Sequence, residues 1–139
     1  MTEKKKIARP LPRPNAYMNT EQFWEGTKEG KLLMQYCKDS GKFQWYPRPV
    51  SIYTGKRNME WRQVSGMGTL YSWTMTYSAW PGHEDRVPYV CAYVDLDEGP
   101  RMLVNLFNCE RDKIQIGMRV KLTWEKLEDG TNYPAFEPA

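Results

Sequence analysis

The stretch TLYSWTMTY, residues 69–77, decides the fold class of this 139-residue chain. Its residues alternate between two faces: Leu70, Ser72, Thr74 and Thr76 fall on one, and Tyr71, Trp73, Met75 and Tyr77 on the other. A period of two is typical of a strand that buries one face. The stretch therefore predicts a sheet that covers a core on one side.

More strand-like runs lie around it, and turn residues separate them. Residues 59–66 (MEWRQVSG) precede it, and 88–96, 101–107, 118–127 and 133–138 follow, with Gly and Asp in the turns at 97–100 and 128–130. Five strands after residue 58, with a longer excursion at about 108–118 between the third and fourth, predict a small Greek-key barrel of the OB-fold type. A β-sandwich is the alternative.

The N-terminal third follows different rules. Capping residues before Glu21 predict a short helix over about 20–30, which needs Phe23 and Trp24 to dock because Gly26 and Gly30 weaken it. LLMQYC (32–37) and KFQWYP (42–47) then predict a hairpin around a turn at 39–41.

The stretch CKDSGKFQWYPRPVSIYTG, residues 37–55, has the outline of a zinc ribbon without its ligands. The four positions where such a ribbon has cysteines are Cys37, Ser40, Ser51 and Thr54. A structural zinc ion needs four thiolate or imidazole ligands, and hydroxyls are poor substitutes. The sequence therefore predicts no bound metal, with Ser51 and Thr54 bonding to nearby backbone instead.

Composition places the chain among soluble globular proteins of about one domain. Hydrophobic residues make up 40% and aromatic residues 14% of the sequence, so it can form a core. No run is apolar enough for a membrane helix, and the first residues lack the apolar segment of a signal peptide. Three cysteines at irregular spacing favour reduced thiols and a cytoplasmic location, without membrane association.

The positive charge belongs to one end of the chain. Residues 1–17 hold five basic residues and one acidic residue, or +4, while the remainder has 15 basic and 16 acidic residues, or −1. We therefore divide the chain into a flexible basic arm (1–17), a helix with a degenerate zinc-ribbon hairpin (18–58), and an OB-fold domain (59–139).

Several blocks, taken in order, resemble one known family over nearly the whole chain from about residue 22. They are FWEG at 23–26, the strand pair around Cys37 with YPR at 46–48, SGMGTLYS at 65–72, PYVCAYVDLDEG at 88–99 and IGMRV at 116–120. The chain is similar to acyl-CoA-associated proteins that join an N-terminal helix and a rubredoxin-like zinc ribbon to an OB-fold domain. Members of this family are non-catalytic small subunits of thiolase-superfamily enzymes.

The resemblance implies an accessory subunit in a hetero-oligomer. It would help to bind or gate an acyl-CoA, while the partner carries thiolytic, condensing or retro-aldol chemistry. The ribbon is expected to survive as a metal-free hairpin packed by Phe43, Trp45, Tyr46 and Tyr53. Cationic side chains can pair with phosphate, and aromatic rings can stack on a base. On this ground we predict that the following residues contact acyl-CoA or the partner: Arg48, Tyr53, Lys56, Arg57, Trp80, His83 and Arg86.

No catalytic set is apparent. His83 stands in a polar stretch without a nucleophile beside it, and Cys91 lies in a strand where we expect an inert core thiol. Asp95, Asp97 and Glu98 are expected to shape a hairpin end rather than to bind calcium. A stand-alone hydrolase or ketosynthase is therefore disfavoured.

The alternative from the fold alone is an OB-fold protein that binds single-stranded nucleic acid. Such proteins use stacked aromatic rings and a basic groove. A body with a charge of −1 lacks the excess of cations that releases counterions from a phosphate backbone, so nucleic acid is the disfavoured partner.

Overall fold

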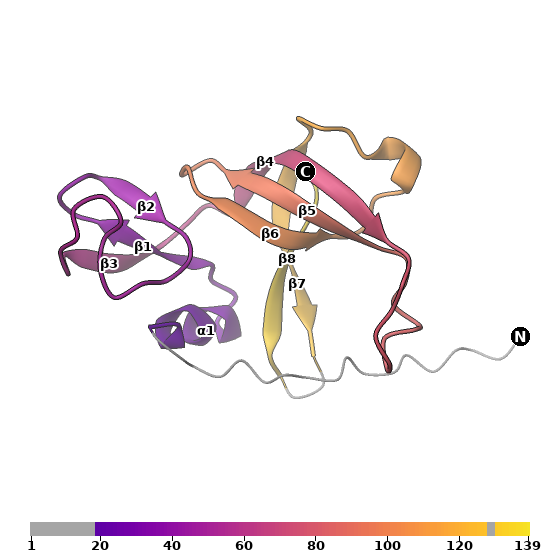
Figure 1. Cartoon of the computed structure of the whole chain (residues 1–139), viewed down its shortest axis with the longest axis horizontal. Helices are drawn as coiled ribbons and strands as arrows, with labels where there is room; N and C mark the ends of the chain where they lie inside the picture. The colour runs from indigo at the N-terminus through magenta and orange to yellow at the C-terminus, as the bar shows by residue number, and fades with distance from the viewer. Residues whose placement is uncertain (1–18, 128–129) are drawn as a thin grey trace, which may run out of the picture.

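The computed structural model describes residues 19–127 and 130–139. It is mainly β, with one short helix and a closed barrel, as the sequence predicted (Figure 1). The expected basic arm at 1–17 lies outside the described residues. In chain order the elements are α1 (Glu21–Lys28), β1 (Leu33–Cys37), β2 (Lys42–Gln44), β3 (Met59–Gln63), β4 (Met67–Thr76), β5 (Tyr89–Leu96), β6 (Arg101–Leu106), the 3₁₀ turn η1 (Arg111–Lys113), β7 (Arg119–Lys126) and β8 (Asn132–Pro138).

The ribbon is a three-stranded sheet in the order β2-β1-β3. Strands β1 and β2 form the predicted hairpin, with Tyr36 opposite Phe43. Strand β3 pairs antiparallel with β1 along its whole length, from Leu33 opposite Gln63 to Cys37 opposite Met59. Strand β3, which follows the boundary expected after residue 58, thus pairs within the ribbon sheet, and the first strand of the barrel is β4, from Met67.

The barrel closes in the order β4-β5-β6-β8-β7, which is a five-stranded OB-type arrangement rather than a sandwich. Strand β6 runs parallel to β8, and the other neighbours are antiparallel. The predicted excursion between the third and fourth barrel strands contains η1.

A β-bulge at Leu70/Ser72 changes the faces that strict alternation predicted for β4. Leu70 points into the core, but Tyr71 is exposed, and Ser72 lies opposite the exposed Tyr93. Beyond the bulge Trp73 packs against the core, so it shares the buried side with Leu70. One extra residue in a strand shifts the later side chains to the other face, and sequence alternation alone cannot locate it.

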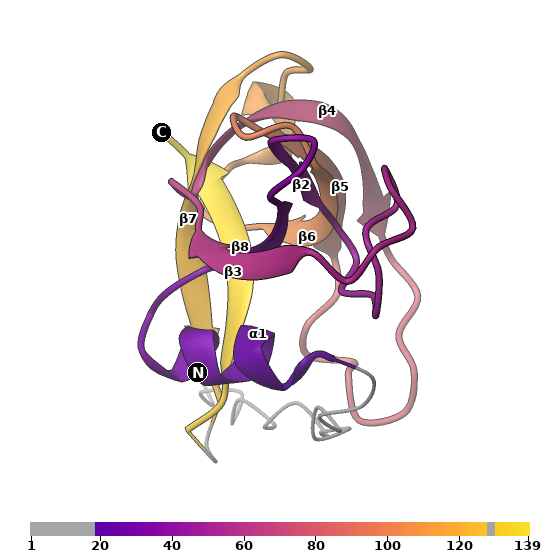
Figure 2. The ribbon, with the colours of Figure 1, turned by 90° about the vertical axis from the view of Figure 1, so that its left-hand side faces the viewer.

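Helix α1 lies beside the β7–β8 hairpin and joins the ribbon to the barrel (Figures 1 and 2). Phe23 is buried between the rings of Trp24 and Trp45, each 5.0 Å away between ring centroids. Trp24 meets Tyr133 of β8 at 5.4 Å, and Asn132 Nδ2 donates to the Thr27 carbonyl at 2.9 Å. The predicted docking of Phe23 and Trp24 thus places the ribbon against one end of the barrel.

Within residues 19–127 and 130–139, no helix has the length and apolar content that would span a bilayer.

Candidate functional site

Two turns of the ribbon share a hydrogen bond and a glycine of the same φ, and we call them the knuckle turns: residues 37–41 and 51–55. In each, the glycine at the fifth position donates its N–H to the carbonyl of the first residue at 2.8 Å. Both glycines have a positive φ, +69° at Gly41 and +72° at Gly55, which a residue with a Cβ adopts at a cost. The turns thus keep the backbone of a C-x-x-C-G pair, although only Cys37 retains its thiol.

In the second knuckle turn, side-chain hydroxyl groups accept hydrogen bonds from the backbone. Ser51 Oγ accepts the Tyr53 N–H at 3.1 Å, and Thr54 Oγ1 accepts the Lys56 N–H at 3.2 Å. This is the local bonding to backbone that the sequence predicted for these two residues.

Cys37 is fully buried in the first knuckle turn. The hydroxyls of Ser40 and Ser51, followed by the backbone N–H groups of Ser40 and Asp39, stabilise its thiolate and lower its pKa to about 7, although burial opposes this shift.

Two buried glutamines join the ribbon together, and sequence reasoning missed them. Gln35 and Gln44 are 5% and 2% exposed, and Gln44 Nε2 donates to Gln35 Oε1 at 2.8 Å. Gln35 also bonds both backbone groups of Arg48, accepting its N–H and donating to its carbonyl at 2.8 Å each. Gln44 accepts the Ile52 N–H at 2.9 Å and donates to the Val50 carbonyl at 3.2 Å. The pair therefore fixes the loop at 48–52 to the hairpin.

The aromatic packing that we expected to hold the ribbon is only partly present. Trp45 packs on Phe23, and Phe43 lies 5.1 Å from Tyr36 between ring centroids. Tyr46 and Tyr53 are exposed, although the Tyr53 hydroxyl donates to the Phe43 carbonyl at 2.8 Å. Amide hydrogen bonds, more than rings, occupy the interior of the hairpin.

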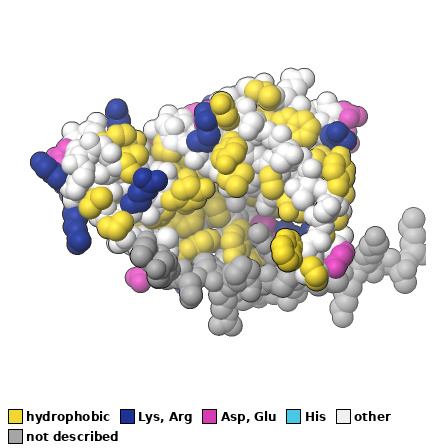
Figure 3. Space-filling view, viewed as in Figure 1, with side chains coloured by type: hydrophobic (Ala, Val, Ile, Leu, Met, Phe, Trp, Pro, Cys, Tyr) yellow, Lys and Arg dark blue, Asp and Glu magenta, His cyan; other side chains and the backbone are white. Residues whose placement is uncertain are grey.

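A cleft of about 1260 Å³ lies between the ribbon and the barrel. Phe23, Trp24 and Trp45 line one side, and the loop after β4 lines another with Trp80 and His83. The lining continues over β5 and β6 with Cys91, Leu103 and Asn105, and over the β7–β8 hairpin with Trp124 and Tyr133. Hydrophobic side chains gather on this face of the molecule, from the ribbon to the lower part of the barrel (Figure 3).

The charged groups of the cleft include an ion pair. Arg86 Nη2 contacts Glu125 Oε1, and the two side chains are 27% and 15% exposed. Arg86 follows two successive turns of the loop, in which the His83 N–H donates to the Trp80 carbonyl and the Arg86 N–H to the His83 carbonyl, both at 2.9 Å. The turns position Trp80, which is 83% exposed, at the edge of the cleft.

A second, polar pocket of about 320 Å³ lies between the start of α1 and the ribbon. Arg48, Arg57 and Trp61 are among its lining residues. The segment 45–49 lines both sites, since Trp45, Tyr46 and Pro47 face the cleft while Arg48 and Pro49 face the polar pocket. The start of α1 is likewise shared, because Thr20 lines the cleft while Asn19 and Glu21 line the pocket.

The structure thus divides the predicted contact residues into groups. Trp80, His83 and Arg86 meet in the cleft, and Arg48 and Arg57 meet in the polar pocket. Tyr53 and Lys56 line neither site, and both are exposed near the second knuckle turn.

Cys91 corrects a further expectation, because it is not a core thiol. It is only partly buried and lines the cleft, on the face of β5 opposite Val90 and Ala92. The Asn105 amide and the Thr76 hydroxyl lie 4.0 Å and 3.9 Å from its sulfur. The apolar run around Cys91 suggested a buried strand, but it did not show which face of that strand meets the core.

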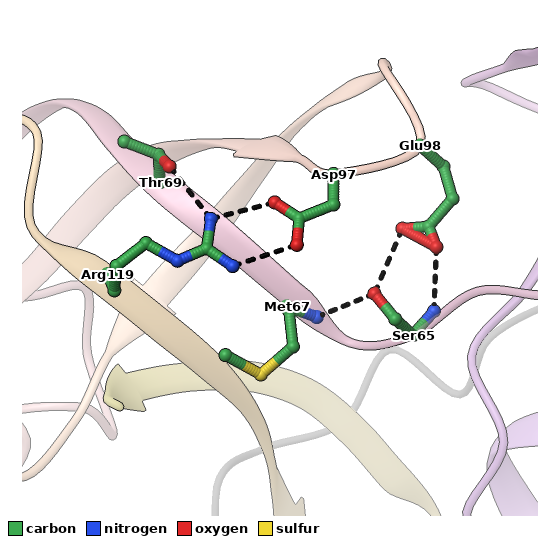
Figure 4. Close-up of polar contacts among 6 residues, drawn as sticks. All are labelled: Ser65, Met67, Thr69, Asp97, Glu98 and Arg119. Carbon is green, nitrogen blue, oxygen red and sulfur yellow. Dashed lines mark hydrogen bonds and ion pairs between the residues drawn. The ribbon is translucent and has the colours of Figure 1, made fainter.

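The blocks SGMG, DLDEG and GMRV meet at the junction between ribbon and barrel (Figure 4). Arg119 holds Asp97 with two bonds of 2.7 and 2.8 Å and also donates to Thr69, while Glu98 accepts the Ser65 N–H at 2.8 Å. Asp97 keeps a lowered pKa because of the hydrogen bonds from Arg119. These acidic residues shape a hairpin end, as predicted, and fix the linker from β3 to β4.

Comparisons with known proteins agree with this architecture. Residues 24–50 match the rubredoxin-like zinc ribbon domain of ChsH2, and residues 61–125 match its C-terminal OB-fold domain. A DUF35 domain-containing scaffold protein of Pyrococcus furiosus is 31% identical over 112 residues, which cover 81% of this chain and 82% of that protein. This chain belongs to the ChsH2-type DUF35 family.

Two further relatives of this DUF35 chain are linked by name to enzymes. A chain of the Ltp2-ChsH2(DUF35) aldolase is 31% identical and has a TM-score of 0.82, over 91% of this chain and 98% of that chain. A probable enoyl-CoA hydratase alpha subunit of Thermomonospora curvata is 33% identical over 138 residues, or 99% of this chain. This chain spans 42% of the length of that hydratase subunit.

The metal implied by a zinc ribbon does not fit the residues present in this DUF35 chain. The four ligand positions hold one thiol, that of Cys37, and three hydroxyls. Two of these hydroxyls, those of Ser51 and Thr54, already accept hydrogen bonds from backbone N–H groups. Among the described residues, no three His, Cys, Asp or Glu side chains come together in a way that could hold an ion. Zinc takes thiolate and imidazole ligands in such sites.

Proposed function

We propose that this DUF35 chain is a non-catalytic accessory subunit that assembles with a thiolase-superfamily enzyme in the cytoplasm and helps to bind or gate its acyl-CoA substrate. The partner supplies the nucleophile and carries out thiolytic, condensing or retro-aldol chemistry at a carbon–carbon bond. In this proposal the subunit binds no zinc and associates with neither membranes nor nucleic acid.

One observation carries the proposal: a chain of the Ltp2-ChsH2(DUF35) aldolase has the same fold, with a TM-score of 0.82 and 31% identity, and the alignment covers 98% of that chain. That likeness covers both the ribbon and the barrel, which supports a comparable place for this chain beside a partner enzyme. The scaffold name of the Pyrococcus relative supports the same accessory role.

The linings of the cleft and the polar pocket support acyl-CoA as the ligand. Acyl-CoA combines phosphates and an adenine with an apolar acyl group. The polar pocket offers two guanidinium groups and an indole, which suit phosphate and a base, beside the single carboxylate of Glu21, and the cleft offers rings and aliphatic groups.

The cleft supports a binding role more than independent catalysis. Within residues 19–127 and 130–139, no hydrogen bond joins the His83 ring to the side chain of a Cys, Ser or Thr. A histidine that activates a nucleophile needs that contact.

The outer face of β4–β6 offers little support for the alternative function, binding of single-stranded nucleic acid. Tyr71 and Tyr93 are exposed there, as in OB-fold proteins that stack bases. Arg101, however, lies 3.3 Å from the Tyr71 ring centroid and binds Asp95 with two hydrogen bonds. Its charge is therefore balanced, and its guanidinium covers the ring.

Co-expression with the thiolase-like protein of a neighbouring reading frame tests the proposal. We expect the two chains to co-purify and to co-elute in size-exclusion chromatography at physiological salt. The assignment would change to nucleic-acid binding if this chain eluted separately from every such partner and bound oligo-dT tightly at the same salt concentration.

A further inference from the structure

The cleft between the ribbon and the barrel is lined by aromatic rings from several elements. Trp24 and Trp45 come from α1 and the ribbon, Trp80 from the loop after β4, and Trp124 from β7. Rings on separate elements suit an occupant that presents apolar groups in more than one direction. The volume of about 1260 Å³ exceeds that of most small-molecule pockets, which is roughly 300–1,000 Å³, so the cleft has room for a short length of peptide.

The charged groups in the lining of the cleft balance one another. Its carboxylates are those of Asp85 and Glu125, and its cations are those of Arg86 and Lys126, with His83 neutral. Arg86 contacts Glu125 directly. Coulomb energies of opposite sign cancel in such a lining. An occupant of the cleft must therefore be held by its apolar groups rather than by its charge.

The described part of the chain begins at the edge of this cleft. Thr20, at the N-terminal end of α1, lines the cleft, and so does Phe23 in the first turn of the helix. Residues that precede Asn19 therefore join the fold beside the cleft. An extended chain advances by at most about 3.6 Å per residue, so the five residues 14–18 can span up to about 18 Å from that point.

The segment RPLPRP, residues 9–14, has the composition of a peptide that binds among aromatic rings. Each of its residues is a proline or directly precedes one, so the sequence restricts each to extended backbone conformations. Such a segment loses little conformational entropy when it binds, and proline-rich peptides dock in aromatic-lined grooves for this reason. With three residues per turn of a polyproline II helix, Leu11 and Pro14 share one side while Pro10 and Pro12 face two others.

We propose that the segment 9–14 of this chain lies in the cleft, with Leu11 and the three prolines against its rings. The occupant is then the chain's own arm, and it competes with any ligand or partner segment that enters the same space. This inference goes beyond the proposed function, because it concerns the chain by itself.

Cysteine labelling measures whether the arm fills the cleft. Cys91 lines the cleft and Cys109 does not, while both are partly buried. In the full chain, the triple variant Pro10→Ser, Pro12→Ser, Pro14→Ser should let iodoacetamide alkylate Cys91 about threefold faster or more, followed by peptide mass spectrometry. Cys109 should keep its rate, because the three substitutions lie outside every described helix and strand.

The triple variant Lys4→Gln, Lys5→Gln, Lys6→Gln is the matched control. It removes three charges from the same arm and leaves the segment 9–14 unchanged, so Cys91 should react as it does in the natural chain. A synthetic peptide of residues 7–16, added to the proline variant, should restore the slower rate at Cys91. The same peptide carrying the three Pro→Ser changes should not restore it.

Calorimetry with the peptide of residues 7–16 tests where it binds. Trp80→Ala, made in the proline variant, should weaken binding of the peptide about threefold to tenfold, because the peptide loses contact with an indole ring. Tyr93→Ala in the same background is the control and should leave the affinity unchanged, since Tyr93 is exposed on the barrel and does not line the cleft.

Equal alkylation of Cys91 in the natural chain and in both arm variants would overturn the proposal and leave the cleft to a ligand or a partner. An equal loss of peptide affinity in Trp80→Ala and Tyr93→Ala would overturn it as well. So would protection of Cys91 that disappears on dilution, because the arm would then come from a second copy of the chain. The accessory role is tested separately, by co-purification with the partner.

Discussion

Gln44 makes three hydrogen bonds while only 2% of its surface is exposed. Buried amides need all their partners, because an unpaired polar group loses its water without compensation. A glutamine in a strand is normally expected to face solvent, so nothing in the sequence pattern placed Gln35 and Gln44 inside the ribbon. The hydroxyls at Ser51 and Thr54 were predictable because their bonds are local, whereas the glutamine bonds depend on how the loop at 48–52 folds back.

Replacing Gln44 by Leu should lower the free energy of unfolding by about 3 kcal/mol, because it leaves the Ile52 N–H and the Val50 carbonyl without their partner. Urea denaturation followed by tryptophan fluorescence measures this. Gln63→Leu on the exposed end of β3 is the control and should change stability by less than about 0.5 kcal/mol. Similar losses in both variants would show that the amide pair does not hold the loop.

Cys37 should make stability depend on pH in a defined direction. Its folded pKa of about 7 lies below the ordinary value of 9.0, so the native state favours the thiolate. That contribution is fully present above pH 9, and is lost as the pH falls through about 7. The difference in free energy of unfolding between the natural chain and Cys37→Ala should therefore grow between pH 7 and pH 9. A difference that stays constant over this range would contradict a stabilised thiolate.

At the scale of elements, local sequence signals predicted the individual strands and the helix, but they did not predict which distant strands pair. Alternation and turn residues located α1, the β1–β2 hairpin and the barrel strands. They did not show that β3 pairs with β1, because the two strands are separated by the loop and the second knuckle turn. They also missed the bulge in β4, which depends on where β4 meets β5 rather than on its own residues.

The knuckle turns should accept a metal if their thiols are returned. Their matching backbones and positive-φ glycines are retained, so the triple variant Ser40→Cys, Ser51→Cys, Thr54→Cys should purify with about one zinc per chain by elemental analysis. The unaltered chain, purified in parallel, should carry no stoichiometric zinc. One zinc per natural chain would refute a metal-free ribbon, and an empty triple variant would show that the turns no longer approach in a tetrahedral arrangement.

At the scale of the whole molecule, the candidate site depends on how the ribbon docks on the barrel. Residue types suggested Arg48, Arg57, Trp80, His83 and Arg86, but not that they divide between two pockets. That division follows from the position of α1 against β8, through Trp24 and Tyr133. The contact joins residues more than 100 positions apart, and single-sequence patterns carry no information on it.

Phe23→Ala should test this docking. Phe23 is buried between Trp24 and Trp45, and its removal leaves a cavity, so we expect a loss of about 4 kcal/mol in the free energy of unfolding. Chemical denaturation measures the loss, and Ile116→Ala, which truncates an exposed apolar side chain, should be nearly neutral. A small effect at Phe23 would mean that the ribbon holds its place without α1.

The amide pair inside the hairpin has a physiological consequence. A ribbon closed by glutamines needs no ion delivered during synthesis, so we expect this protein to mature normally in cells starved of zinc and to keep its shape in the presence of EDTA. Supply of the trace element would then not limit how much folded protein a cell can accumulate.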